Sequence, residues 1–538
     1  MDKPSGLGEP SAVGANTSAA VVAAPDDASR DVKRLAGGTG IALGGKIVGR
    51  GVRLFVDVAL ARLLGPFTFG LYALGWTVTR VVTLISPLGL NAGVIHFGSR
   101  HWGRDPAGLK GVVLECLKLA LISGLFFAGV AWLAAPWLGV GVFHNPQEVP
   151  VLRCFALVFP LATGLNVAAA ATRVSQRMKF SVATEDMGQP LIQFVLVLLL
   201  FFLWKLGLPS ALIACVFSFG LAMGLALVYI KGLFPEVTSR DLVAKSSPGP
   251  LLAYSLPAST VGVLGVLLIW VDRLIVGYFR PAADVGIYQA ASQLAVSFNV
   301  VLGAFGAIFA PMTAYHYHRG EVGRVAELYK VSTKWGLYWS LPPFLLICFA
   351  SRQVMQLLYG KPYVAGWYAL MILAFGQVVK AATGPVGTLL VMTGKQNQML
   401  ILSAVVFAVS VILGVILVPL WGMAGAASAT ALALMVLFVT AVYLAHRVFK
   451  MRPYDRRFLK CLAATAGAAV VLWMLRWLPI HSPLVIVALN LAAAAGVFAV
   501  ILLILGLDAE DREFIALLRR RLAGALSGTQ AGDTNTRA

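Results

Sequence analysis

Apolar segments of roughly 20–28 residues recur along almost the whole of this 538-residue chain, and they limit the folds that it can adopt. A helix needs about 20 consecutive apolar residues to cross a bilayer. Only 12% of the residues are charged, whereas a soluble domain has about a quarter. The pattern predicts an all-α polytopic membrane protein with about fourteen transmembrane helices, at approximately 38–62, 68–94, 110–134, 150–172, 186–206, 209–232, 250–278, 286–312, 326–350, 364–391, 397–419, 423–447, 457–479 and 483–507.

Lysine and arginine are unevenly distributed among the predicted loops. Every second loop is rich in them, as in the segment with Arg100, Arg104 and Lys110 and the segment from Arg447 to Lys460. The alternate loops are short and poor in positive charge. Because positive residues accumulate in cytoplasmic loops, both termini are predicted to be cytoplasmic. The net charge of +20 then needs no nucleic-acid partner.

The chain also repeats internally. A segment near the end of the first predicted span and one near the end of the seventh both contain an aspartate, a proline, a glycine and a tyrosine in that order. These residues are Asp57, Pro66, Gly70 and Tyr72 in the first copy and Asp272, Pro281, Gly286 and Tyr288 in the second. Since an even number of spans separates the copies, both enter the membrane in the same sense. This predicts two parallel six-helix lobes around a central cavity, followed by two extra C-terminal helices.

This organisation divides the chain into six parts. The first 35 residues are rich in Ala, Gly, Ser and Pro, and EDREFIALLRRRL near the C-terminus is typical of an amphipathic helix on a membrane surface. The parts are a disordered cytoplasmic N-terminal tail (1–35), an N-lobe (36–233), a cytoplasmic linker (234–249), a C-lobe (250–449), the last two spans (450–508) and a cytoplasmic amphipathic and disordered tail (509–538).

Four charged residues share one face of the first predicted span. Lys46, Arg50, Arg53 and Asp57 fall within a stripe roughly 60° wide at the helical repeat. A charge at the bilayer centre costs about 2.5–3.5 kcal/mol on insertion scales, so this face must look at water, other charges or a charged ligand. Arginine donates paired hydrogen bonds to phosphate oxygens. We therefore predict that the stripe lines a substrate cavity, with Asp57 as a partner of Arg53 or Arg80. The alternative is that Lys46 lies at the membrane interface and that Arg53 and Asp57 form a structural ion pair.

Further charged residues lie inside other predicted spans. Arg80 stands in the middle of the second span and is expected to face the same cavity. Asp272 and Arg273 are adjacent in the seventh span, so only one can face the lobe interface squarely, and a structural role is an equal alternative. Lys334 and Lys380, in the ninth and tenth spans, are candidate contacts from the C-lobe, or lie near enough to a helix end to reach the interface.

The first two predicted spans resemble those of a known family. The segment GKIVGRGVRLFVDVALARLLGPFTFGLYALG, followed by a span ending in LISPLGLNAGVIHFGSR, resembles the polysaccharide transporters, the Wzx-type flippases for lipid-linked oligosaccharides. They belong to the superfamily of multidrug, oligosaccharidyl-lipid and polysaccharide exporters. The resemblance, over about residues 36–507, implies a protein of the bacterial cytoplasmic membrane that moves undecaprenyl-diphosphate-linked oligosaccharide from the inner to the outer leaflet by alternating access. A basic residue is common in the second helix of this family, which supports the cavity role of Arg80.

Several functions remain alternatives at this stage. A cation-coupled multidrug exporter would need acidic residues to dominate the cavity, and a peptidoglycan-precursor flippase is a close relative. A membrane polysaccharide polymerase or ligase would need a large outer loop, which the sequence lacks. The chain contains no motif for ATP hydrolysis or sugar transfer, so we expect a transporter that is not an enzyme and uses no cofactor or metal, with H⁺ or Na⁺ as candidate coupling ions. Expected partners are the lipid-linked glycan, membrane lipids, a polysaccharide polymerase and glycosyltransferases.

Overall fold

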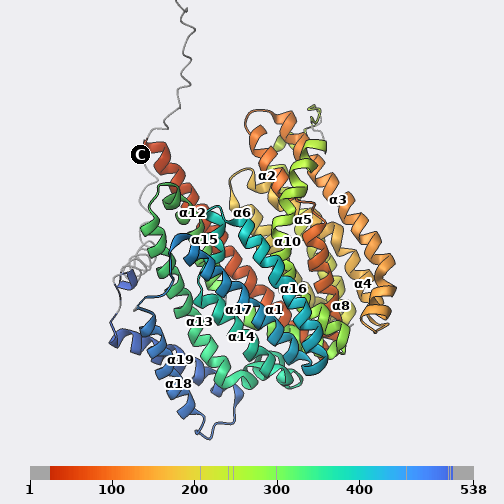
Figure 1. Ribbon diagram of the computed structural model, residues 1–538. Helices are drawn as coiled ribbons and strands as arrows, with labels where there is room; N and C mark the ends of the chain where they lie inside the picture. The colour runs from red at the N-terminus through yellow and green to blue at the C-terminus, as the bar shows by residue number, and fades with distance from the viewer. Residues whose placement is uncertain are drawn as a thin grey trace, which may run out of the picture.

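The computed structural model describes residues 25–205, 207–239, 241–245, 248–297, 300–455, 457–506, 508 and 510–512, and no strand occurs among them. Long helices make up almost all of this part of the chain (Figure 1). Eleven of its helical segments are long and apolar enough to cross a membrane. The predicted all-α polytopic membrane fold is confirmed, whereas the count of fourteen spans stays a prediction.

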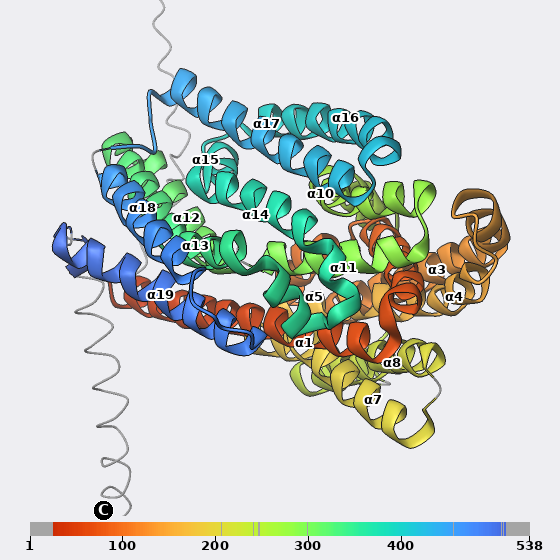
Figure 2. The same ribbon diagram turned by 90° about the horizontal axis from the view of Figure 1, so that it is seen from below.

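The helices before residue 240 pack against one another as one bundle (Figures 1 and 2). We call it the first bundle. Its elements are α1 (Pro25–Ile85), α2 (Leu90–His101), α3 (Pro106–Pro136), η1 (Trp137–Val142), α4 (Glu148–Ala156), α5 (Val158–Arg173), α6 (Met178–Ser181), η2 (Val182–Asp186), α7 (Gly188–Trp204), α8 (Leu208–Leu233) and α9 (Pro235–Thr238).

The following helices form a second bundle, and the last two lie against its α13 helix (Figure 2). We call the last two the C-terminal pair. The second bundle contains α10 (Pro248–Phe279), α11 (Ala282–Ser297), α12 (Val300–His318), α13 (Val322–Tyr359), η3 (Lys361–Gly366), α14 (Trp367–Ala382), α15 (Val386–Met392), α16 (Gln396–Trp421) and α17 (Met423–Phe449), and the pair is α18 (Arg457–Leu475) and α19 (Pro483–Ile504).

Helix α1 begins earlier than the sequence suggested. It starts at Pro25, so residues 25–35, expected as part of a disordered tail, are helical. Proline at the first helical position and the acidic Asp26 and Asp27 in the first turn both favour a helix start there. The amphipathic helix and disordered end expected after residue 512 lie outside the described residues.

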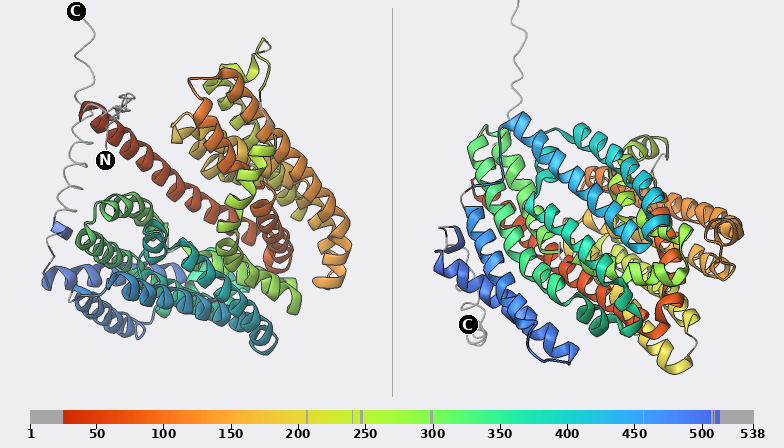
Figure 3. Two further views of the ribbon diagram at one scale, coloured as in Figure 1. Left: turned by 45° about the horizontal axis from the view of Figure 1, so that its top comes forward. Right: turned by 60° about the horizontal axis from the view of Figure 1, so that its bottom comes forward.

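Two spans join within α1 at a sharp bend. Gly65 has φ +74° and ψ 169°, a backbone conformation that glycine adopts without strain, and Pro66 begins the next helical stretch. Figure 3 shows the part of α1 before this bend lying between the other helices of the first bundle and the second bundle. The bend reverses the chain at one end of the molecule, the end that the loop charges predict to be external.

At that end the two bundles meet through the repeated glycines. A Cβ atom added at Gly70 would collide with the carbonyl oxygen of Ala282 in α11, and one added at Gly286 would collide with the carbonyl oxygen of Pro66 in α1. The contact is therefore reciprocal, as expected for two copies related by a pseudo-two-fold axis. Small residues at such positions let helix backbones approach closely in a membrane. Tyr363 also joins the two bundles at this end, because its hydroxyl donates a hydrogen bond of 2.8 Å to the carbonyl oxygen of Ala61 in α1.

The bundles also touch at the opposite end, between α2 and α10. The rings of His96 and Tyr254 stack with their centroids 4.3 Å apart. A Cβ atom at Gly93 would meet the Ser255 hydroxyl, so glycine again permits a close approach. The two bundles therefore touch at both ends of the molecule, with the charged part of α1 between these contacts.

Candidate functional site

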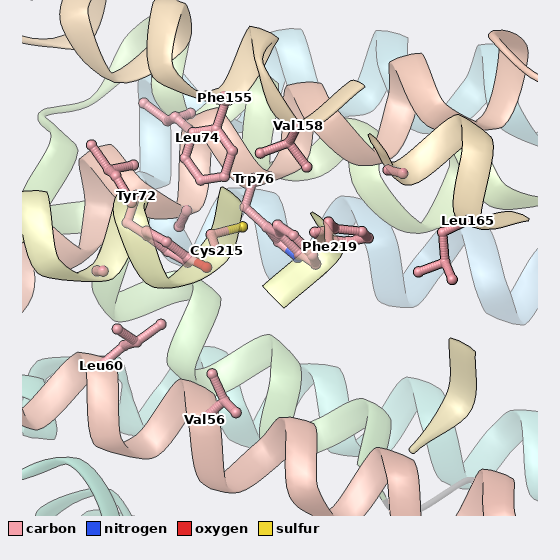
Figure 4. Packing of buried hydrophobic residues seen from close by; sticks show 14 of the residues in the cluster. Val56, Leu60, Tyr72, Leu74, Trp76, Phe155, Val158, Leu165, Cys215 and Phe219 are labelled. Carbon is pink, nitrogen blue, oxygen red and sulfur yellow. The ribbon is translucent and has the colours of Figure 1, made fainter. Parts of the chain in front are cut away.

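Two guanidinium groups of the first bundle lie over a single indole ring. The Cζ atom of Arg53 is 5.1 Å from the ring centroid of Trp76, and that of Arg80 is 4.5 Å from it. Trp76 itself is buried beside Phe155 and Phe219 (Figure 4). A cation over an indole face gains about 0.5–2 kcal/mol, so the ring offsets part of the cost of keeping two positive charges inside the membrane.

A buried amide chain orients Arg53. Its Nη2 donates to Oε1 of Gln189 at 2.6 Å, and Nε2 of Gln189 donates to Oε1 of Gln193 and to the hydroxyl of Ser218, both at 3.0 Å. Nε2 of Gln193 in turn donates to the Tyr72 hydroxyl at 2.7 Å. One donor of Arg53 is thereby committed, and no other hydrogen bond of its side chain occurs among the described residues.

Arg80 has fewer internal partners than Arg53. No hydrogen bond or ion pair of its side chain occurs within the described part of the protein, and its buried Nε is without an acceptor there. A guanidinium in this state can still donate to an anion without first giving up a partner.

Asp57 also lacks a direct partner. Its side chain is only 8% exposed, yet no ion pair or hydrogen bond of its carboxylate occurs among the described residues. The charges that act on it are, in order of strength, those of Arg53, Arg80 and Arg273. Neither arginine that the sequence offered as a partner forms an ion pair with it. Asp57 therefore interacts with the cluster through space, without a direct ion pair.

Arg50 reaches from α1 toward the second bundle. A Cβ atom added at Gly303 in α12 would lie 3.6 Å from its Nη1. On the other side, Nζ of Lys380 in α14 lies 5.6 Å from the ring centroid of Phe438, and the charges of Lys380 and Arg50 act on one another. No carboxylate pairs with either cation within the described residues. The charge of Arg50 also acts on the carboxylate of Asp186 in η2, without a direct ion pair.

Lys46 lies nearer the end of α1 predicted to be cytoplasmic and is exposed. Its charge acts on Glu185 and Asp186, which belong to η2. Glu185 is itself paired with Arg173 at 2.9 Å. Lys46 is therefore at the rim of the basic region, beside two carboxylates.

Asp272 and Arg273 form a closed pair in α10. Nη1 of Arg273 contacts Oδ1 of Asp272 at 2.8 Å, and Arg273 also donates to Gln289 at 2.6 Å and to Ser292 at 2.7 Å. The Tyr288 hydroxyl donates to Oδ2 of Asp272 at 2.7 Å. Because these bonds use most of the available donors and lone pairs, the pair is committed to the bundle's interior.

Lys334 in α13 faces carboxylates that follow the C-terminal pair. Its Nζ lies 2.9 Å from Asp511, 3.2 Å from Asp508 and 3.6 Å from Glu510. Lys460 adds a second amino group 2.7 Å from Asp508. The side chain of Lys334 is 2% exposed, so its charge is balanced by the chain itself in this arrangement.

The pH dependence of this cluster can be predicted from Asp508. Burial would raise the pKa of its carboxyl, but hydrogen bonds from Lys460 and Lys334 outweigh burial and lower the pKa from its ordinary value of 3.8. A lowered pKa in the folded state stabilises the fold above the unfolded pKa, and this stabilisation is lost as pH falls through the folded pKa. We expect Asp508→Asn to lower stability at neutral pH by roughly 1.5–3 kcal/mol and to remove this acid dependence.

Thermal unfolding in nanodiscs between about pH 3 and pH 7 measures that effect. Asp241→Asn is the matched control, because Asp241 is exposed and has no ion pair in the described part of the chain. Equal acid sensitivity of Asp508→Asn and the unmodified protein would contradict the prediction.

The structure thus places one group of the predicted site residues in a shared region, which we call the basic region: Arg50, Arg53, Asp57, Arg80 and Lys380. Lys46 lies at the rim of this region. The Asp272–Arg273 pair and Lys334 belong to two other clusters. Sequence reasoning did not single out Trp76 or Gln189. Trp76 could have been found, because it precedes Arg80 by four residues and so lies on the same helical face. For Gln189, in another helix, no sequence signal indicated contact with Arg53.

The chain is similar to known proteins both in sequence and in fold. A family model described as polysaccharide biosynthesis protein matches residues 59–366, more than half of the chain. The chain belongs to this family. The resemblance drawn from the first and second spans is therefore confirmed, and the matched range contains the second repeated segment and all of the first except Asp57.

Two proteins of known role are distant relatives of the chain. The chain is 23% identical over 223 residues to the probable low-salt glycan biosynthesis flippase Agl15 of Haloferax volcanii, covering 41% of this chain and 47% of that protein. It is 23% identical over 344 residues to the succinoglycan biosynthesis transport protein ExoT of Rhizobium meliloti, covering 61% and 63%. The matches thus span less than two thirds of either relative's length.

Solved structures establish the fold. The lipid II flippase MurJ in an inward closed conformation superposes with a TM-score of 0.67 at 13% identity, over 85% of this chain and 96% of that one. An inward-facing multidrug resistance transporter of the MATE family superposes with a TM-score of 0.63 at 17% identity, over 74% and 94%. The chain therefore shares its overall fold with these two transporters.

Proposed function

We propose that this protein is a flippase that moves a polyprenyl-diphosphate-linked oligosaccharide, with undecaprenyl as the expected lipid, from the inner to the outer leaflet. The observation that carries the proposal is that Arg50, which reaches toward α12, and Lys380 in α14 act on one another across the two bundles, and neither forms an ion pair among the described residues. Arg80 adds a guanidinium with free donors. A diphosphate supplies the missing negative charge and can accept hydrogen bonds from both bundles at once.

Alternating access follows from this arrangement. In our proposal the N-lobe (36–233) and C-lobe (250–449) rock against each other, opening the basic region first to the cytoplasm and then to the exterior. Fourteen spans with both termini in the cytoplasm complete the topology. The named relatives act in glycan biosynthesis, which supports a site in the bacterial cytoplasmic membrane and a role in surface polysaccharide synthesis.

The proposed protein is a transporter without enzymatic chemistry of its own. A glycosyltransferase series would build the lipid-linked substrate on the inner leaflet, and a polymerase would consume it on the outer leaflet. No cofactor is required in this scheme. The driving force is the consumption of product or a gradient of H⁺ or Na⁺, for which the partnerless Asp57 is the residue we favour.

We expect Arg50→Ala, Arg80→Ala and Lys380→Ala each to reduce transport roughly 10- to 150-fold, because a charge-assisted hydrogen bond contributes about 1.5–3 kcal/mol. Arg50→Lys should retain more activity than Arg50→Ala, since it keeps the charge. Export of surface glycan is measured in a deletion host that carries each variant, alongside flipping of a fluorescent polyprenyl-diphosphate glycan in proteoliposomes. Lys231→Ala, an exposed lysine at the end of α8, is the control and should export normally.

Full export by all three alanine variants would refute the assignment of the site. The same proteoliposomes distinguish the second candidate, a cation-coupled exporter of organic cations, which the unpaired Asp57 favours. That function predicts that Asp57→Asn abolishes extrusion of ethidium and that Arg50→Ala does not. A peptidoglycan-precursor flippase would instead transport lipid II in preference to other polyprenyl-linked glycans.

A further inference from the structure

A polar cavity lies where α13 and α14 meet the C-terminal pair. It has a volume of about 520 Å³, within the range of about 300–1,000 Å³ that is typical of small-molecule sites. Its lining comes from the ends of α13 and α18, the start of α14 and the first turns of α19. None of the residues of the candidate functional site contributes to it, so the proposed transport path leaves this cavity without a role.

Two arginines give the cavity its charge. Arg352 from α13 and Arg476 from the turn after α18 both line it, and neither forms an ion pair with any carboxylate that the structure describes. The guanidinium of Arg352 lies over the ring of Trp367, with Cζ 4.6 Å from the centroid. Stacking fixes the plane of this guanidinium while its donors remain available. The two guanidinium groups, of Arg352 and Arg476, line one space and suit a phosphate, which accepts paired hydrogen bonds from arginine.

Uncharged polar groups complete the lining. Asn490 in α19 is 6% exposed; its Nδ2 donates to the carbonyl oxygen of Ile486 at 2.8 Å, but its Oδ1 receives no hydrogen bond from the described residues. Ser351 and Gln353 line the cavity and likewise form no hydrogen bond through their side chains within that part of the chain. A ligand that carries hydroxyl groups next to its phosphate could satisfy these acceptors and donors.

The surroundings of the cavity indicate its depth in the membrane. Trp473 and Trp477, near the end of α18, are exposed and pack edge-to-face with ring centroids 6.2 Å apart. Exposed tryptophans concentrate at the level of the lipid headgroups, where their rings are partly in hydrocarbon and partly in water. The adjoining Arg476 is therefore at the height at which lipid phosphates lie.

We propose that this cavity binds the phosphate headgroup of an anionic lipid that bears hydroxyl groups. The C-terminal pair, which lies outside the internal repeat, supplies Arg476 and Asn490, so the site exists only because these two helices are present. That the lipid belongs to the outer leaflet rests on the proposed topology; the binding itself does not. A bulk lipid such as phosphatidylglycerol and the polyprenyl phosphate carrier share the phosphate, and the experiment separates them.

Binding is tested on the full-length protein in nanodiscs of phosphatidylcholine, by titration with fluorescent phosphatidylglycerol, undecaprenyl phosphate or additional phosphatidylcholine. We expect saturable binding of at least one phosphate-bearing anionic lipid. The double variant Arg352→Gln/Arg476→Gln should weaken it at least about tenfold, because both charge-assisted contacts are lost. Saturation by phosphatidylglycerol alone identifies a bulk lipid, and saturation by undecaprenyl phosphate identifies the carrier.

Arg280→Gln is the matched control, because Arg280 is an arginine after α10 at the same end that is already paired with Asp284 at 2.8 Å. It should bind lipid as the unmodified protein does. Gel filtration and thermal unfolding of each variant establish that it is folded. Gln353→Leu is a milder change. It should weaken the binding of phosphatidylglycerol more than that of phosphatidic acid, which has no headgroup hydroxyls. Unchanged affinity in the double arginine variant, or equal binding of phosphatidylcholine, overturns the proposal. Loss of glycan transport in Arg50→Ala with normal lipid binding keeps the two proposals separate.

Discussion

Replacing Arg273 with alanine is expected to destabilise the protein by about 3–5 kcal/mol, the typical cost of removing one member of a buried ion pair. Arg273 is 1% exposed. Its loss would leave the Asp272 carboxylate inside α10 without a counter-charge, held by the hydroxyls of Tyr288 and Thr430 and by the backbone N–H of residue 273. It would also leave Gln289 and Ser292 without the donor that now satisfies them.

Thermal unfolding of purified protein in nanodiscs measures this effect. Arg280→Ala is the control, since Arg280 also forms a 2.8 Å ion pair but its side chain is 44% exposed. Exposed pairs contribute only about 0–1 kcal/mol. The double variant Asp272→Ala/Arg273→Ala should recover part of the loss, because neither charge is then left alone. If Arg273→Ala is as stable as Arg280→Ala, the closed pair does not stabilise the bundle.

Gly70→Val is expected to reduce transport at least about tenfold while membrane insertion stays normal. The added side chain would collide with the Ala282 carbonyl oxygen, a backbone atom that cannot turn aside. Helices α1 and α11 would then have to separate at the end where the bundles meet. Since alternating access requires this end to close as well as open, the transporter would be held in one state.

Spin labels at Phe67 and Lys361 test the separation, because both residues are exposed and lie at this end on different bundles. The distance between the labels should increase in Gly70→Val. Gly129→Val is the control, since nothing lies within 4 Å of a Cβ atom added at Gly129 in α3. An unchanged label distance together with normal export would show that the glycine contact is dispensable.

Helical periodicity predicted much of the basic region from sequence. It placed Lys46, Arg50, Arg53 and Asp57 on one face of the first span, and the cost of buried charge indicated that Arg80 would join them. The structure brings Arg53 and Arg80 to one ring, Trp76. Such reasoning succeeds because residues on one helical face are neighbours whatever the rest of the fold does.

The partners of the other charges could not be predicted in this way. Lys334 contacts Asp508, which is 174 residues away in the chain, and the charge of Arg50 acts on Lys380 of the other bundle. Periodicity shows which residues share a face but not how that face is rotated toward other helices. The pairing of Arg273 likewise depended on the positions of Gln289 and Ser292 on α11, a helix that the repeat located but did not orient.

The two repeated aspartates have different surroundings. Asp272 is held by Arg273 and Tyr288, whereas the carboxylate of Asp57 has no partner among the described residues. The carboxylate is thus held inside the helix in the second copy and left without a partner in the first. The halves are therefore not interchangeable: a chimaera built from two N-terminal halves would contain neither Arg273 nor Lys380, and a chimaera of two C-terminal halves would lack Arg50, Arg53 and Arg80.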